Sequence, residues 1–184
     1  MRIIGITGTL GAGKGTVVDY LKQEYGFVHF SVREFLKKEV ALRGMPQNRD
    51  SYTFVANELR AQHTPSYITD QLYCQAEALG KNAVIESIRT PGEIDALEKK
   101  PNFQLWAVDA KPAVRYDRVV LRNSETDHID YDTFLSNERR EMFSDDPNKQ
   151  NLSVCIQRAK AVLHNDGTRE ELYAQVDAIL KHEI

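Results

Sequence analysis

The sequence predicts an α/β fold, a three-layer α/β/α sandwich in which helices cover both faces of about five parallel strands. Five short apolar runs alternate with amphipathic segments along the 184 residues, at 3–6, 27–30, 83–85, 105–108 and 161–163. These runs are continuously apolar rather than alternating, which is typical of strands that are buried on both faces of a parallel sheet. Short connections between strand and helix then favour the layered arrangement.

Helix starts support this order of elements. The spacing Ser/Thr-x-x-Glu, which predicts a capping box, occurs at 31–34, 90–93 and 168–171, and Pro91 stands at the first helical position of the second. Two segments interrupt the alternation. Residues ~31–80 insert mainly helical sequence between the second and third strands, and residues ~122–150 are polar, as expected of a mobile lid or of a loose loop.

Charge and composition exclude several classes of protein. The 24 basic and 27 acidic side chains give a net charge of −3, which argues against a nucleic-acid coat and against an anionic-membrane binder. No apolar run reaches the roughly 18 residues of a membrane span. Cys74 and Cys155 form no CxxC pair, so we expect neither disulfides nor zinc, but two small buried side chains in a reducing compartment. The expectation is one cytoplasmic domain over residues 1–184, whose phosphate sites must be local.

The most specific motif is a complete GxxxxGK run between the first predicted strand and a helix. Glycines in such a loop let backbone N–H groups point at phosphate oxygens, while the helix N-terminus and the lysine add positive charge. The sequence therefore predicts an ATP phosphate site. The residues assigned to it are Gly8, Leu10, Gly11, Ala12, Gly13, Lys14, Gly15 and Thr16.

The residues after the lysine narrow the class. Most such loops continue with Ser or Thr, whose hydroxyl binds Mg²⁺, but here Gly15 takes that place and Thr16 follows. We expect Mg²⁺ to be held by nucleotide phosphates, waters and a carboxylate elsewhere, with no direct protein ligand assigned. Gly-Lys-Gly-Thr in this setting resembles the adenylate-kinase branch of the nucleoside monophosphate kinases, in the P-loop nucleotide kinase family.

The end of the third strand resembles a second element of that family. Nucleotide kinases carry Asp-Gly followed by Arg here, and this chain has Glu86, Ser87 and Arg89. The resemblance implies that Glu86 orders the waters around Mg²⁺ and that Arg89 grips the acceptor phosphate, which a planar guanidinium can bind through two oxygens. The alternative is that Glu86 and Arg89 simply pair at the strand end.

A third element lies near the C-terminus, where Asn165-Asp166-Gly167 links a strand to a capped helix. It resembles the turn near the nucleotide base in dephospho-CoA kinases and kinase-like relatives, although Asn-Asp-Gly also forms a good turn on its own. The three motifs follow the family's order over the whole chain. The resemblance then implies an acceptor-binding insert at ~31–80 and a lid at ~111–150.

Further basic residues are candidates for completing the site. Arg115, Arg118 and Arg122 share one helix face by their spacing, and in lidded kinases an Arg at the lid entry stacks on the base while later ones reach the phosphates. We assign the first role to Arg122 and the second to Arg139. A solvated helix face is the alternative. Weaker candidates on the acceptor side are Arg33, Lys37 and Arg60.

The expected function is transfer of the ATP γ-phosphate to a small nucleotide-like acceptor with Mg²⁺, most simply a nucleoside or deoxynucleoside monophosphate. Catalytic roles go to Lys14, Glu86, Arg89 and Arg139. Dephospho-CoA kinase is the alternative; in that family an Asp-x-Asp follows the second strand, whereas here only Glu34 is available, as a general base or as a helix-cap residue. A second alternative class is a nucleotide-dependent switch or assembly-factor NTPase.

Overall fold

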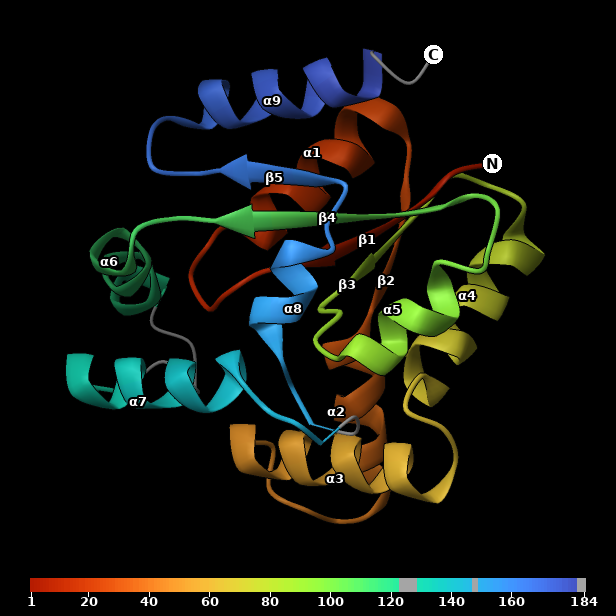
Figure 1. Cartoon of the computed structure of the whole chain (residues 1–184), viewed down its shortest axis with the longest axis vertical. Coiled ribbons are helices and arrows are strands. Elements are labelled where there is room, and N and C mark those ends of the chain that lie inside the picture. Colours follow the sequence, from red (N-terminus) through yellow and green to blue (C-terminus); the bar gives the residue numbers. More distant parts are fainter. Residues whose placement is uncertain (123–128, 147–148, 182–184) are drawn as a thin grey trace.

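The computed structural model describes residues 1–122, 129–146 and 149–181, and its centre is a five-stranded sheet (Figure 1). The strands are β1 (Ile3–Thr7), β2 (Val28–Ser31), β3 (Ala83–Glu86), β4 (Phe103–Asp109) and β5 (Ala161–His164). All pair in parallel, in the order β2-β3-β1-β4-β5. The predicted class and all five predicted strands are confirmed.

Helices cover both faces of the sheet, as Figure 1 shows. On one face α1 (Lys14–Tyr25) and α9 (Arg169–Lys181) bury an apolar cluster against the strands, which includes the fully buried Trp106. On the other face lie α4 (Tyr67–Leu79), α5 (Pro91–Leu97) and α8 (Leu152–Gln157), which enclose a second cluster together with the helices of the insert. Burial from both sides explains why the central strands β1, β3 and β4 read as apolar runs, whereas the edge strands β2 and β5 are only partly buried.

The predicted helix starts are confirmed, and their cap residues form hydrogen bonds. Thr90 and Glu93 form a full capping box with Pro91 at the start of α5. The Ser31 side chain accepts from the Glu34 backbone N–H at 3.2 Å and begins α2 (Val32–Leu42). These caps satisfy backbone donors that have no partner inside the helix, and they fix where the chain turns away from the sheet.

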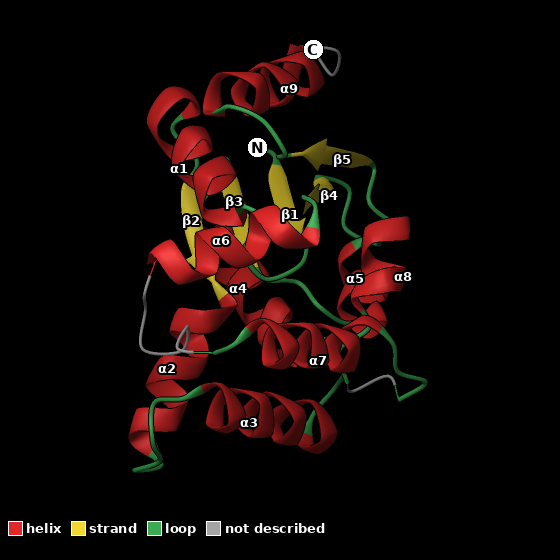
Figure 2. Cartoon of the chain, turned by 90° about the vertical axis from the view of Figure 1, so that its left-hand side faces the viewer, coloured by secondary structure: helices red, strands yellow, loops and turns green. Residues whose placement is uncertain are grey.

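Four helices project beyond the carboxyl ends of the strands (Figures 1 and 2). They are α2 and α3 (Arg49–Gln62) from the insert, with α6 (Pro112–Arg122) and α7 (Tyr131–Met142) from the later segment. In both views α7 lies between α6 and α3. The reading of this polar segment as a loose loop is wrong for its described part, because twelve of its residues form α7, capped by Asp130.

Two smaller expectations have different outcomes. Cys155 is buried as expected, but Cys74 is exposed because it lies on α4 one residue beyond the buried Tyr73, which turns it away from the core. Neither cysteine forms a disulfide. Among the described residues, no helix has the length and apolar character that crossing a membrane requires.

Candidate functional site

A cleft of about 740 Å³ opens where the chain leaves the carboxyl ends of β1, β2 and β3. Parallel α/β sheets bind ligands at this edge because the loops that follow the strands meet there. The phosphate loop after β1 forms one end of the cleft, and α2 and α3 form the other. Of the eight predicted loop residues, Gly8 and Ala12 are buried beneath the surface, and the other six line the cleft.

The shape of the phosphate loop depends on glycine at two tightly packed positions. Gly8 has φ +136°, and a Cβ built on it would lie 2.1 Å from the carbonyl oxygen of Val108 on β4. Gly13 has φ +100°, and its Cβ would lie 2.1 Å from Nδ2 of Asn165. Both conformations favour glycine, and both positions lack room for a side chain. The loop is therefore built against β4 and against the C-terminal turn.

Lys14 folds back over this loop. Its Nζ donates to the carbonyl oxygens of Gly8 at 2.9 Å and Thr9 at 2.8 Å. Burial and the charge of Arg89 lower the pKa of Lys14 to about 7, although the Glu86 carboxylate opposes this. An ammonium whose charged form is disfavoured in the free protein gains more from a neighbouring anion, so Lys14 is suited to phosphate binding.

Glu86 stands at the end of β3 and lines the cleft. Burial would raise the pKa of its carboxyl group, but the hydrogen bond with His29 at 3.2 Å and the charge of Lys14 outweigh burial, so the pKa is lowered. The carboxylate is therefore ionised. In the described ranges, no group of three His, Cys, Asp or Glu side chains gathers as a metal site. An ionised carboxylate at this position fits Mg²⁺ held through its waters, which is how this ion is commonly bound.

Ser87 has φ +75°, in the left-handed region that favours glycine. It occupies the place where the resembling kinases carry glycine. Its N–H donates to the Ile6 carbonyl oxygen at 3.0 Å, and the next N–H donates to the same oxygen at 3.1 Å. This turn directs the chain from β3 across the end of β1 and brings Arg89 to the cleft.

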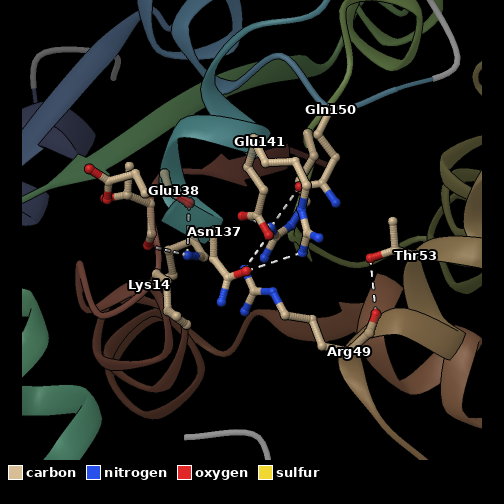
Figure 3. A network of polar contacts seen from close by, with 12 residues as sticks. Lys14, Arg49, Thr53, Asn137, Glu138, Glu141 and Gln150 are labelled. Carbon is tan, nitrogen blue, oxygen red and sulfur yellow. Dashed lines mark hydrogen bonds and ion pairs between the residues drawn. The ribbon is translucent and has the colours of Figure 1, made fainter. Parts of the chain in front are cut away.

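The Arg89 side chain pairs with residues far along the chain rather than with Glu86. Its Nη1 donates to Oε2 of Glu141 at 2.8 Å and to Oε1 of Gln150 at 2.9 Å. The other oxygen of Glu141 accepts from Arg49 on α3 (Figure 3). Burial would raise the pKa of Glu141, but the charges of Arg89 and Arg49 lower it, so a buried carboxylate bridges two guanidinium groups.

Only some of the arginines predicted for the lid region line the cleft. Arg122 lines the cleft at the end of α6, and Arg118 lines it while donating to the Asn165 carbonyl oxygen at 2.8 Å. Arg115 turns away and pairs with Glu138 of α7. Arg139 is exposed on α7 and does not line the cleft. The geometry therefore brings Arg122, but not Arg139, to the other site residues.

The candidates on the acceptor side also differ in whether they line the cleft. Arg33 and Arg60 line the cleft, whereas Lys37 lies outside it and pairs with Glu34 at 3.1 Å. Arg60 is buried in an ion pair with Glu93 at 2.8 Å, so it also supports the cleft wall. Glu34 lines the cleft, and its backbone N–H is capped by Ser31.

The C-terminal turn joins the site through Asn165. This buried side chain donates through Nδ2 to the Ala12 carbonyl oxygen at 2.8 Å. Asn165 and Gly167 line the cleft beside the phosphate loop. The sequence pattern alone favoured a plain turn, but the structure ties this turn to the loop.

Sequence reasoning missed His29, Arg49 and Glu141. His29 belongs to a mostly apolar strand run and faces Glu86 only because β2 pairs with β3, an order that local patterns do not give. Glu141 lies in a charged stretch typical of a solvated helix face, and only the position of α7 between α6 and α3 buries it. These residues could not be predicted because their partners lie far away in the sequence.

Comparison with known proteins places this geometry in context. The family described as an AAA domain matches residues 4–144. A UPF0200 protein of Methanococcus maripaludis strain C7 is 28% identical over 192 aligned residues, covering 99% of this chain and 97% of the relative.

Three solved structures are similar over nearly their whole length. TT1252 from Thermus thermophilus has a TM-score of 0.64 and 22% identity, covering 98% of this chain and 97% of that one. Shikimate kinase from Bacteroides thetaiotaomicron has a TM-score of 0.56 and 12% identity, with coverage of 98% and 97%. Dephospho-CoA kinase from Campylobacter jejuni has a TM-score of 0.54 and 10% identity, with coverage of 98% and 96%. At these identities the likeness shows a P-loop kinase-like fold.

Proposed function

The chain belongs to the AAA domain family, and from that premise we propose that it is an ATP-dependent phosphotransferase acting on a small nucleotide-like acceptor. The acceptor that we favour is a nucleoside or deoxynucleoside monophosphate. One observation carries this proposal: a single cleft joins the phosphate loop to an arginine-rich end formed by α2, α3 and the turn after β3. Two phosphate-binding ends in one cavity suit transfer between two phosphorylated substrates.

The charge of the cleft supports an anionic pair of substrates. Among the described residues, eight basic and four acidic side chains line it, in a chain whose net charge is −3. The basic side chains are Lys14, Arg33, Arg49, Arg60, Arg89, Arg118, Arg122 and Arg169. Guanidinium groups bind phosphate oxygens in pairs, so this excess favours phosphate over a neutral acceptor.

Phosphoryl transfer needs alignment of the two substrates and positive charge over the migrating group more than covalent help. In this scheme Lys14 leaves the loop carbonyls and neutralises charge on the transferred phosphoryl group. Arg89 holds the acceptor, and Arg122 lies on the ATP side. Arg139 takes part only if α7 moves, because its side chain is exposed outside the cleft.

The proposal includes Mg²⁺, for which Glu86 is the candidate ligand. The carboxylate would hold the ion through water, and the ion would supply charge neutralisation between the ATP phosphates. His29 keeps the Glu86 carboxylate oriented by its 3.2 Å contact.

A hydroxyl acceptor is the second candidate, as in a dephospho-CoA kinase. The observation that favours it is Glu34, which lines the cleft on the acceptor side and would serve as the general base that a hydroxyl needs. A Glu34→Gln variant with full turnover on dephospho-CoA would count against this candidate.

The test is ADP release from Mg-ATP with a panel of acceptors: nucleoside and deoxynucleoside monophosphates, dephospho-CoA, and buffer alone. We expect strong stimulation by one monophosphate. A flat panel with slow basal hydrolysis would contradict the phosphotransferase and would favour a nucleotide-dependent switch or assembly factor.

A further inference from the structure

The strongest unexplained feature of the cleft is the carboxylate of Glu141. It is 5% exposed, yet it comes from α7, an element outside the sheet and its covering layers. Both of its oxygens are used, one by Arg49 of α3 and one by Arg89 of the turn after β3. Figure 3 shows Glu141 and Gln150 directed toward the same group of side chains that Arg49 approaches from α3.

Arg49 and Arg89 come from two different elements but together form one positively charged site. Their side chains are 24% and 22% exposed, and both line the cleft, so a ligand in the cleft can reach them. A carboxylate has two oxygens and one negative charge. A phosphate monoester has three free oxygens and close to two charges near neutral pH, so it satisfies two guanidinium groups more completely.

Glu141 is poorly suited to its own helix. It lies in the last turn of α7, which ends at Met142, and the negative end of the helix dipole disfavours a carboxylate there. The two arginines, and not the helix dipole, therefore stabilise the Glu141 carboxylate at the cleft.

From this geometry we propose that the Glu141 carboxylate is an internal stand-in: in the free protein it occupies the place between Arg49 and Arg89 that the acceptor's phosphate monoester takes on binding. The acceptor phosphate displaces Glu141, and the displacement frees the end of α7 from α3. Acceptor binding is thereby coupled to the position of α7. The assignment of the phosphate to an acceptor rests on the proposed function; the anion site and its occupant do not.

The alternative role for Glu141 makes the opposite prediction. If the carboxylate were a permanent clamp that orients the two arginines, its removal would weaken anion binding. If it is an occupant that must leave, its removal makes more of the protein ready to bind and tightens binding.

The experiment is calorimetric titration with inorganic phosphate in saturating Mg²⁺ and a non-hydrolysable ATP analogue, which fills the phosphate loop. We expect Glu141→Gln to bind phosphate about tenfold more tightly than the natural chain, because no carboxylate competes. Arg49→Gln should bind about tenfold more weakly, since it removes one guanidinium. Unchanged or weaker binding by Glu141→Gln would overturn the proposal.

Glu138→Gln is the matched control. Glu138 lies one turn earlier on α7 and pairs with Arg115 instead of the cleft arginines. This substitution removes one negative charge from the same helix but leaves Glu141 between Arg49 and Arg89. We therefore expect the affinity for phosphate to stay within about twofold of that of the natural chain. An equal tightening in both variants would reduce the effect to net charge and overturn the proposal.

A second measurement needs no variant. Hydrogen exchange of the 137–142 amides should become faster when phosphate is added, because α7 loses its tie to Arg49 and Arg89. Slower or unchanged exchange would overturn the displacement.

The same titration without the ATP analogue separates this proposal from the proposed function. If the analogue does not bind, the phosphotransferase fails, while the effect of Glu141→Gln on phosphate binding by the free protein still decides the present inference.

Discussion

Gly8 offers the sharpest test of how the phosphate loop is built. Gly8→Ala would place a Cβ 2.1 Å from the Val108 carbonyl oxygen, a contact that β4 cannot relieve without moving a central strand. The φ of +136° adds backbone strain for any residue with a side chain. Strain at such a conformation costs about 1–3 kcal/mol, and forced overpacking costs about as much again. We expect a loss of about 4 kcal/mol in the free energy of unfolding.

Gly15→Ala is the matched control, because it makes the same change in the same motif, just after the loop enters α1. A Cβ there meets nothing within 4 Å, and the residue is inside α1, where Ala is favoured over Gly. We expect it to be neutral or stabilising by up to about 1 kcal/mol.

Urea denaturation followed by circular dichroism measures both variants. Thermal unfolding should show Gly8→Ala melting roughly 8–16 °C lower, from the usual relation between free energy and Tm for a chain of this size. Similar stability for the two variants would refute the reasoning, because it would mean that the close approach of Gly8 to β4 does not constrain the loop.

Further predictions concern charge and backbone strain in and around the cleft. Lys14→Ala should lower turnover by about 10²-fold or more with the fold retained, measured by ADP release and circular dichroism, because Lys14 acts on the migrating charge; near-normal turnover would contradict the site. Since the pKa of Lys14 is about 7 in the folded protein and ordinarily 10.5, the unfolded chain binds more protons between these values. Stability should therefore rise with pH through that window, and urea titrations at pH 7 and 9 should show a smaller rise in Lys14→Met. Arg60→Met leaves the fully buried Glu93 without its ion-pair partner and should cost about 3–5 kcal/mol by urea denaturation; a loss below 1 kcal/mol would contradict the importance of this pair. Ser87→Gly should raise the free energy of unfolding by up to about 1 kcal/mol by relieving the φ of +75°, and a clear loss would show that the Ser87 side chain stabilises the turn.

The fold was predictable because its signals are local. Each strand contains a short apolar run, and four of the five strands are followed by a recognisable helix cap or glycine turn, so the alternation of elements could be read along the chain. The phosphate loop was predictable for the same reason, since strand, glycines, Lys14 and helix are contiguous.

The rest of the cleft was not predictable, because it depends on how distant elements meet. Arg89 was singled out as an acceptor ligand, but its contact with Glu141 spans 52 positions and follows from where α7 lies. Arg122 and Arg139 were both candidates, for stacking on the base and for reaching the phosphates, and only the structure distinguishes a side chain in the cleft from one exposed on α7. His29 acquired its role through the pairing of β2 with β3, which periodicity does not reveal.

The central claim is that the two ends of the cleft hold the donor and the acceptor of one phosphoryl transfer. It is tested most directly with ATP labelled in its γ-phosphate, incubated with Mg²⁺ and each nucleoside monophosphate, followed by separation of the products. We predict that the label appears in a nucleoside diphosphate formed from one acceptor, and that Arg89→Ala abolishes this product while ATP still binds. Label recovered only as inorganic phosphate, at the same rate with and without acceptor, would contradict the claim.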